Sequence, residues 1–335
     1  MTVITSENYW SVVFRELQEE ISRNSYIKYL YISKKYDQAI KAVEDRIGVW
    51  YGNHALDNKV SLRQAYKRLP KDQLEQFHDM IELYLKYWHE ELGYDKDELK
   101  VSEKDTVEDT SDSDTPETLS NTDSWIETLI LYQEKKDVTC YEALVIPIVQ
   151  EVEKASHETS LALLALLAIT GVAVHKSIAE NLGFKAIPTN QIKKELLKSW
   201  AADDMDLYSR FNANKAKLSS SVKAALVKGF RGNSTVDEVI AEVSKVLEGG
   251  KFAAKRLVTT ENTHFNCYST MLAMKKAGYK AYKINAVIDA KTCDDCIAWD
   301  GDVYPIDDYS PNVTAPPQHS HCRCYVTPAN LKEIE

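Results

Sequence analysis

The sequence has none of the short motifs that mark the common nucleotide-binding and hydrolytic enzymes. Its 335 residues contain no glycine-rich phosphate loop, no G-x-S-x-G nucleophile elbow and no H-E-x-x-H pair. The opening stretch MTVITSENYW also lacks the basic start and the apolar core of a secretory signal. We therefore expect no catalytic residues and no organic cofactor, and nothing points to the oxidising compartment that disulfides need.

Long apolar runs are also missing. The most apolar stretch, LALLALLAITGVAV at 161–174, has fourteen residues. As a helix it would span about 21 Å, which is short of the roughly 30 Å hydrocarbon core of a membrane. We expect this stretch to form a buried central helix, and we expect no membrane contact.

The chain lacks the positive charge of a protein that coats nucleic acid, because its formal net charge is −10. Residues 101–123 carry eight acids and one base. Since such a segment cannot bury enough apolar surface to fold, we predict a flexible acidic linker over 94–124. Residues 251–283 carry seven bases and one acid, which fits contact with phosphate, an acidic partner or a solvated helix face.

Apolar residues recur every three or four positions through most of the chain, which predicts helices. The pattern covers 10–21, 36–50, 62–69, 74–88, 161–174, 189–200, 215–230, 236–247 and 252–277. Ser61 and Ser234 are predicted N-caps, whereas Gly249-Gly250 and Gly278 are predicted helix ends. The many Trp and Tyr residues of 7–92 indicate helix packing or a partner surface.

One stretch near the end, 289–324, concentrates residues that bind metals. It holds four of the six cysteines and two of the eight histidines. A C-x-x-C comes first and a second group of candidates follows. These residues are Cys293, Cys296, His319, His321, Cys322 and Cys324. The pattern predicts a structural zinc ion with four protein ligands, and the spacing leaves the choice within the second group open.

The alternative interpretation of this stretch is a pair of disulfides or unreactive thiols. The remaining cysteines, Cys140 and Cys267, are predicted to be small buried thiols. Alternation over 282–288 predicts a strand that leads into the stretch, and Asp300-Gly301 between short apolar runs predicts a β-hairpin. We therefore expect a small β unit held together by zinc.

The carboxy-terminal motifs follow one another in a distinctive order. A helix with Thr-Glu is followed by Gly-Tyr, a strand, D-x-x-T-C-x-x-C, D-G, P-P-x-H and C-R-C. The residues that carry this pattern are Thr260, Glu261, Asp289, Thr292, Cys293, Cys296, Asp300, Gly301, Pro316, Pro317, His319, Cys322, Arg323 and Cys324. The pattern resembles the phage head morphogenesis (minor head protein) family, the Mu F-like group of tailed phages.

The resemblance extends to other parts of the chain. The helical start, from Tyr9-Trp10 to Trp50-Tyr51, is similar to the family's portal-proximal arm, and KSWAADD from Lys198 also fits. The chain departs from the family at Thr259, where Arg is usual before Thr-Glu, so that the nearest base is Arg256. The acidic linker resembles an insertion.

The resemblance implies a structural protein of the virion that acts at the portal vertex in capsid assembly and in DNA packaging or delivery. It implies the portal protein as partner, with scaffolding and major capsid proteins as further candidates. A weak DNA contact through 251–283 is an additional hypothesis. The protein would lie in the phage head interior or at the portal vertex, and in the host cytoplasm during assembly.

The resemblance also bears on the site. It favours one structural Zn2+ per chain held by Cys293, Cys296, His319 and Cys322 over sets with His321 or Cys324. Two other functions remain as alternatives, a DNA-binding module and a divergent ADP-ribosyltransferase-like enzyme or toxin. The family's carboxy-terminal fold has been compared with that of ADP-ribosyltransferases, so Arg256 and Glu261 would be remnants of a nicotinamide-cofactor site.

Together these observations predict a mainly α protein with elongated helical amino-terminal and middle regions and a small α+β zinc-binding carboxy-terminal unit. The predicted domains are a helical arm (1–93), the acidic linker (94–124), a helical middle region (125–250) and a Mu F-like domain (251–335).

Overall fold

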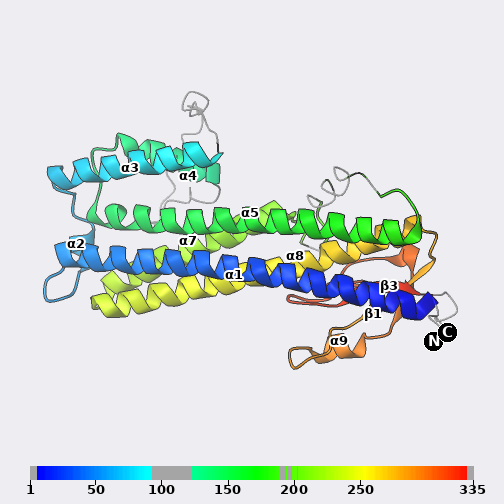
Figure 1. Ribbon diagram of the computed structural model, residues 1–335. Helices are drawn as coiled ribbons and strands as arrows, with labels where there is room; N and C mark the ends of the chain where they lie inside the picture. The colour runs from blue at the N-terminus through cyan, green and yellow to red at the C-terminus, as the bar shows by residue number, and fades with distance from the viewer. Residues whose placement is uncertain are drawn as a thin grey trace. The chain divides into compact units, whose positions relative to one another are not determined.

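The computed structural model describes residues 6–92 and 122–329, except 187, 189–193, 195–197 and 202. Here the chain is mainly helical with a small carboxy-terminal sheet, which confirms the predicted mainly α class with a small α+β unit at the end (Figure 1). The zinc ion of that unit stays a prediction. The helices are α1 (Ser6–His54), α2 (Leu62–Ala65), α3 (Lys71–Leu92), α4 (Thr122–Gln133), α5 (Cys140–Leu182), α7 (Leu207–Arg231), α8 (Val236–Lys276) and α9 (Asp294–Ala298). The strands are β1 (Ala281–Asn285), β2 (Val303–Pro305) and β3 (Tyr325–Ala329). The predicted acidic linker, up to residue 121, and most of the predicted helix 189–200 lie outside the described residues.

The chain divides into two compact units, each assembled from separate segments. Unit 1 combines Met1–Lys34, Glu158–Phe211 and Lys251–Glu335, and unit 2 combines Lys35–His157 and Asn212–Gly250. The helices α1, α5, α7 and α8 therefore each contribute to both units. The four predicted domains are consecutive stretches of sequence, so they do not correspond to these two units. The functions assigned to those domains stay predictions.

Unit 1 is built on α1, α5 and α8, which run side by side (Figure 1). Leu17, Ile21, Val174, Ile178 and Ala273 form one buried cluster between these helices. Apolar side chains at three-to-four spacing form a stripe on each helix. The helices pack together because burying these apolar stripes is favourable.

A polar chain also joins the three helices of unit 1. The Asn262 side-chain amide donates to Ser25 Oγ at 2.9 Å, and the Thr170 hydroxyl lies 3.3 Å from Asn262 Oδ1. Close packing accompanies it at Gly171, where an added Cβ would lie 1.9 Å from a Phe265 ring carbon. Unit 1 therefore fixes the part of α8 that carries the Thr-Glu motif.

Unit 2 has buried polar side chains in its core. The indole N–H groups of Trp88 and Trp125 donate to the same buried oxygen, Gln150 Oε1, at 2.9 and 2.7 Å. Deeper in this unit, Lys215 Nζ lies 2.8 Å from Glu153 Oε2, and both side chains are buried. Such pairs fix helix register, because a buried charge without its partner would be strongly destabilising.

The helix signals predict some of the helix ends and miss others. Ser61 caps α2 in a capping box with Gln64, as predicted. The predicted stop at Gly249-Gly250 is wrong, because α8 continues through both residues. The predicted Ser234 cap is displaced by one residue, since Thr235 and Glu238 exchange the capping hydrogen bonds.

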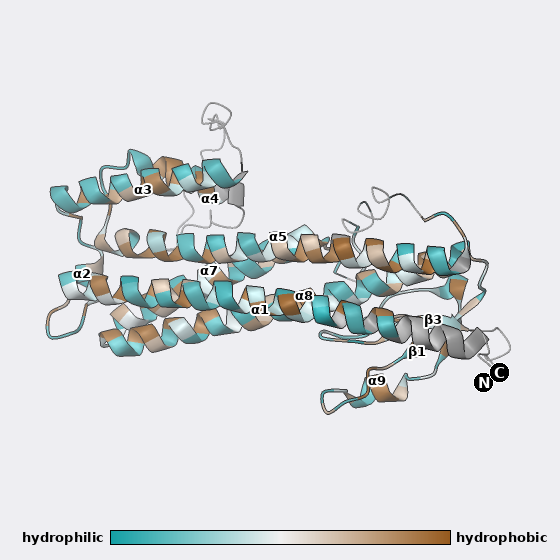
Figure 2. Cartoon of the chain, in the orientation of Figure 1, coloured by the Kyte–Doolittle hydropathy of each residue, from teal (hydrophilic) through white to brown (hydrophobic). Residues whose placement is uncertain are grey.

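The apolar run 161–174 lies within α5. Within the described part of the chain, α5 is a helix long and apolar enough to cross a membrane, judged by length and composition only. Figure 2 shows hydrophobic residues along α5. However, 53% of its most apolar window is buried inside the protein, as in a core helix. This combination is weak support for a membrane span.

The sheet has the strand order β2-β1-β3, and both pairings are antiparallel. The predicted strand 282–288 is confirmed as β1, although it ends at Asn285. Tyr282 and Ile284 point into a buried cluster that also contains Met271 and Met274 of α8. The sheet therefore packs on the last turns of α8, and Gly278, at φ +87°, ends that helix as predicted.

Candidate metal centre

The first half of the candidate site is a tight loop that ends in α9. The Asp289 backbone N–H donates to Thr292 Oγ1, and Asp289 Oδ1 accepts from the Lys291 N–H, both at 2.8 Å. Cys293 then caps α9, because its sulfur accepts from the Cys296 N–H at 3.4 Å. One turn of helix thus places both sulfurs of the C-x-x-C on the same side.

The predicted hairpin at Asp300-Gly301 is wrong in its first half. Residues 294–298 are helical, because Cys293 provides a cap and Asp294 and Asp295 carry negative charge in the first turn. Gly301 does adopt positive φ, at +94°. Its N–H donates to the Ile284 carbonyl, so the turn carries the chain from α9 to the sheet.

The second half of the site is the segment from Pro316 to Cys324. It begins at a cis peptide bond between Pro316 and Pro317. His319 Nδ1 lies 2.7 Å from the Ser320 carbonyl oxygen. Since a carbonyl only accepts, the neutral ring carries its hydrogen on Nδ1 and keeps the Nε2 lone pair for a metal. This is the tautomer that a metal requires at Nε2.

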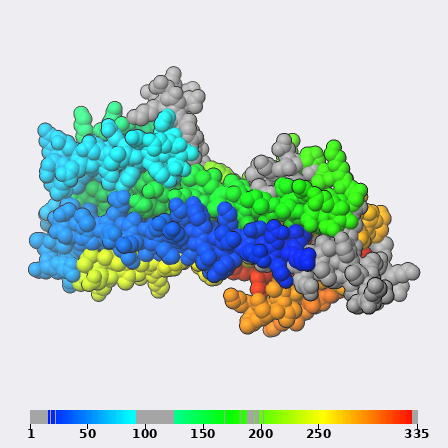
Figure 3. Space-filling view, in the orientation of Figure 1, coloured from blue at the N-terminus to red at the C-terminus, as the bar shows by residue number. Residues whose placement is uncertain are grey.

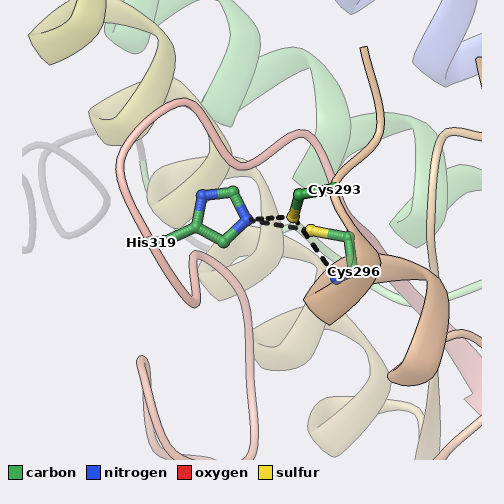
Figure 4. Close-up of side chains that lie close together, drawn as sticks. All are labelled: Cys293, Cys296 and His319. Atoms are coloured by element: carbon green, nitrogen blue, oxygen red, sulfur yellow. Dashed lines mark hydrogen bonds between the residues drawn. The ribbon is translucent and has the colours of Figure 1, made fainter. Parts of the chain in front are cut away.

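The two halves meet at three side chains. His319 Nε2 lies 3.0 Å from Cys293 Sγ and 3.0 Å from Cys296 Sγ, as Figure 4 shows. Cys296 Sγ is also 3.9 Å from Cys322 Sγ, and Cys296, Cys322 and Cys324 have their sulfurs within 4.8 Å of one another. The structure thus brings all four predicted ligands together, with Cys324 as a fifth candidate.

These side chains fit a metal ion by geometry and by chemistry. Tetrahedral bonds of about 2.0–2.3 Å place ligand atoms roughly 3.3–3.8 Å apart. The observed separations of 3.0–3.9 Å bracket that range. The six cysteines, all described, form no disulfide, so the covalent alternative is not realised in this structure. Which four side chains bind the ion stays a prediction.

The thiols are not equivalent in acidity. The Cys296 N–H lowers the pKa of Cys293, and a hydrogen bond from Cys324 lowers the pKa of Cys322 to about 5. Burial instead raises the pKa of Cys296 to about 12, and the bond to Cys322 raises the pKa of Cys324. Cys293 and Cys322 are therefore the thiols most ready to bind as thiolates.

His321 lies apart from this group. Its ring centre is 5.3 Å from that of Phe252, and its Nε2 is buried with no hydrogen-bond partner in the described structure. Burial lowers the pKa of His321. The backbone at His321 has φ +64°, which turns the chain between His319 and Cys322. His319 is therefore the histidine that faces the thiols.

Helix α8 anchors the second half of the site. Thr260 Oγ1 accepts from the His321 N–H at 3.1 Å, and the Thr263 hydroxyl donates to the Cys322 carbonyl at 2.5 Å. The thiol of Cys267 lies 3.6 Å from the Cys324 carbonyl oxygen. The threonine of the Thr-Glu motif thus supports the metal loop.

Arg323 joins the two halves from outside. Its guanidinium donates to both oxygens of Asp289, at 2.6 and 2.7 Å. Arg323 stands between two candidate ligands, and Asp289 opens the loop that leads to Cys293. The bidentate pair explains why an acid and a base occupy these motif positions.

Glu261 has a partner that sequence reasoning missed. The carboxylate accepts from Arg210 Nη1 at 2.5 Å and from the Trp200 indole at 2.9 Å. Arg210 also binds Asp203 at 2.8 Å. The alternative site at Arg256 and Glu261 gains no support here, since Arg256 is exposed whereas Glu261 is buried. The resemblance of KSWAADD to the family was the one signal that pointed to Trp200 and Asp203.

The basic stretch 251–283 is divided in the structure. Lys275 pairs with Asp307 at 2.7 Å, and Lys276 donates to the Lys185 carbonyl. Lys255 lies over the Tyr29 ring, with Nζ 3.9 Å from the ring centre. The stretch therefore does not form one continuous basic face.

Comparison with known proteins locates the resemblance. Residues 217–327 match the family model described as Phage Mu protein F like protein. This range contains the larger part of α7, all of α8 and the whole candidate metal centre. No curated protein and no solved structure matches the chain significantly.

Proposed function

Because residues 217–327 are a Mu F-like region, we propose that this chain is a structural protein of a tailed-phage head. It acts at the portal vertex, where it takes part in capsid assembly and in DNA packaging or delivery. Its partner there is the portal protein, and the mature protein resides in the virion.

One observation supports this proposal above the others. The motif residues of the Mu F-like region, far apart in sequence, form a single connected structure. Thr260 and Thr263 support the Cys322 loop, Arg323 binds Asp289, and His319 meets the C-x-x-C. Such mutual bonding is expected where a motif specifies a folded unit.

We propose that the ion at this centre is one structural Zn2+ per chain. Three sulfurs and one imidazole nitrogen are a donor set that zinc prefers, and four protein ligands leave no open position for a substrate. The ligands are Cys293, Cys296, His319 and Cys322. The small sheet beside the site gains stability from such an ion, because metal binding contributes directly to folding.

The enzyme alternative has less support. A nicotinamide site built on Arg256 and Glu261 would need a carboxylate accessible to substrate. Glu261 is 4% exposed and its oxygens accept from Arg210 and Trp200. A structural role for Glu261 accounts for these contacts.

Co-purification tests the proposed function. The full chain is expressed with the portal protein of the same phage, and the complex is isolated and its stoichiometry measured. We expect a defined complex with the portal ring, and purified virions should contain the chain at a few copies. If the chain neither binds the portal nor occurs in virions, the proposal is wrong.

Elemental analysis tests the metal. Protein purified without chelator should contain about one zinc per chain, and Cys293→Ser should abolish this content. His319→Gln should do the same, whereas His321→Gln should not. Cys322→Ser and Cys324→Ser compare the two candidates for the fourth ligand. A metal-free protein with an intact carboxy-terminal unit would refute the zinc site.

A further inference from the structure

Helix α1 has apolar side chains on two opposite faces in unit 1. Ile21 and Ile32, three turns apart, are buried at 5% and 0% exposure. On the other side Tyr26, Ile27 and Leu30 are 61%, 54% and 48% exposed. A helix that faces solvent normally shows polar residues there, so this second face has the composition of a contact surface.

The exposed residues form a stripe along the helix, which we name the outer stripe. Its members recur at spacings of three and four residues and project from one side of α1. They are Arg23, Tyr26, Ile27, Leu30, Tyr31 and Lys34. Figure 3 shows α1, in blue, at the molecular surface on the face turned to the viewer, with no described segment in front of it.

The border of the outer stripe is basic. Between Glu20 and Asp37, α1 carries bases and no acid. The neighbouring part of α8, between Glu248 and Glu261, likewise contains Lys251, Lys255 and Arg256 and no acid. The two segments are adjacent, because Lys255 lies over the Tyr29 ring and Asn262 bonds Ser25.

This charge pattern bears on what covers the stripe. Pairing with a second copy in antiparallel orientation would place Arg23 opposite Lys34, and Ile27 opposite Leu30. Parallel pairing would place each base opposite itself. Like charges meet in both cases, and such contacts disfavour an interface. Nucleic acid would match the bases, but it would leave the aliphatic side chains Ile27 and Leu30 without an apolar partner.

We infer that the outer stripe is the docking surface for another protein, and that this partner presents an apolar ridge bordered by Asp or Glu. Tyrosine and arginine are enriched among residues that dominate interface energetics, and helices commonly bind through such a stripe. The inference rests on the proposed function, which makes the portal protein the partner to test, and it assigns the contact to one face of α1.

The test uses the full chain, its stripe variant Ile27→Ser/Leu30→Ser and a matched control, Val49→Ser/Leu83→Ser. The control side chains are also exposed, at 68% and 65%, but lie outside the stripe. Affinity for the purified portal protein is measured by titration, and circular dichroism verifies the fold. We expect at least a tenfold loss for the stripe variant and less than a threefold change for the control.

A charge-reversed variant, Arg23→Glu/Lys34→Glu, tests the acidic border. Portal binding by the unmodified chain should weaken as salt is raised, and the reversed variant should lose both affinity and this salt dependence. Sedimentation of the chain alone and binding to random duplex DNA serve as parallel measurements.

The outcomes separate the two proposals. If the unmodified chain, the control and the stripe variant bind portal equally, the docking surface is wrong and the proposed function stands. If none of them binds portal, the proposed partner fails, and the inference fails with it. If the stripe variant loses self-association or DNA binding instead of portal binding, the stripe serves a second copy or nucleic acid, and the inference is overturned.

Discussion

Arg210 and Glu261 form a buried ion pair whose closest approach is 2.5 Å, although 51 positions separate them in the sequence. Their side chains are 10% and 5% exposed. The Arg210 guanidinium also lies over the Trp200 ring, 4.7 Å from its centre. The pair therefore fixes the first turn of α7 against α8, next to Thr260, which bonds the backbone of the candidate metal site.

Removing one member of this pair should be more damaging than removing both. Arg210→Met leaves the Glu261 carboxylate buried without its partner, and we expect a loss of about 3–5 kcal/mol in the free energy of unfolding. The double variant Arg210→Met/Glu261→Met should recover much of this loss. Urea unfolding measures both, with the exposed Arg256→Gln as a control that should change by less than about 0.5 kcal/mol. A single variant as stable as the parent would contradict the pairing.

His264 gives this region a pH dependence. Its ring stacks on Trp200 at 4.3 Å, and burial lowers its pKa to about 3, with the Arg210 charge adding to the effect. The unfolded chain takes up a proton near pH 6.5 that the folded chain does not. Stability should therefore fall by up to about 1.4 kcal/mol per pH unit as the pH drops from 6.5 toward 3.

The variant His264→Phe isolates this contribution. It keeps a ring against Trp200 but cannot take up a proton, so its stability should depend less steeply on pH in the same range. Acid would release the metal from both proteins, so the effect of metal loss on stability cancels when their pH dependences are compared. Equal slopes for the two proteins between pH 6.5 and 4 would show that His264 is charged in the folded state.

The local features of the site could be predicted from the sequence, because they depend on short spacing. The C-x-x-C places two sulfurs within one helical turn. The motif P-P-x-H supplies a histidine as a candidate third ligand. The spacing could not choose between His319 and His321. That choice depends on the positive φ at His321 and on the Thr260 hydrogen bond to its backbone, which are tertiary features.

The failed predictions have physical reasons. Asp300-Gly301 does form a turn, but the turn signal is the same after a helix as after a strand. Arg210 could not be linked to Glu261, because no periodicity connects residues on different helices. The glycine pair at 249 and 250 suggested a helix end from intrinsic propensity, which helix packing overrides in α8.

The ion pair between Asp289 and Arg323 should tune metal affinity from outside the ligand shell. Arg323 donates to both Asp289 oxygens and holds the pKa of Asp289 well below its usual range. We expect Asp289→Asn to weaken metal binding by about 10–100-fold, because the loop before Cys293 loses its orientation. Titration with cobalt(II), followed by its absorption spectrum, measures this affinity.

The matched control for that experiment is Asp307→Asn. Asp307 also pairs with a base, Lys275, at an exposed site in the same unit, but this pair contains no residue next to a candidate ligand. Its variant should bind cobalt(II) as the parent does. If both variants behave alike, the Asp289–Arg323 pair has no specific role at the metal centre.

Adjacent glycines in α8 should respond to the same substitution with opposite sign. Nothing lies within 4 Å of a Cβ added at Gly249, whereas a Cβ added at Gly250 would lie 2.6 Å from a Leu218 methyl carbon. Gly249→Ala should stabilise the protein by about 0.5–1 kcal/mol, since alanine is the better helix former. Gly250→Ala should destabilise it by about 1–3 kcal/mol, because α7 and α8 must separate or Leu218 must leave its rotamer.

Thermal and urea unfolding of both variants measure the difference. The variant Gly250→Ala/Leu218→Ala removes the clash and should leave only the cost of the lost leucine packing. If both single substitutions stabilise the protein, the helices do not approach at Gly250, and its glycine is not explained by close packing.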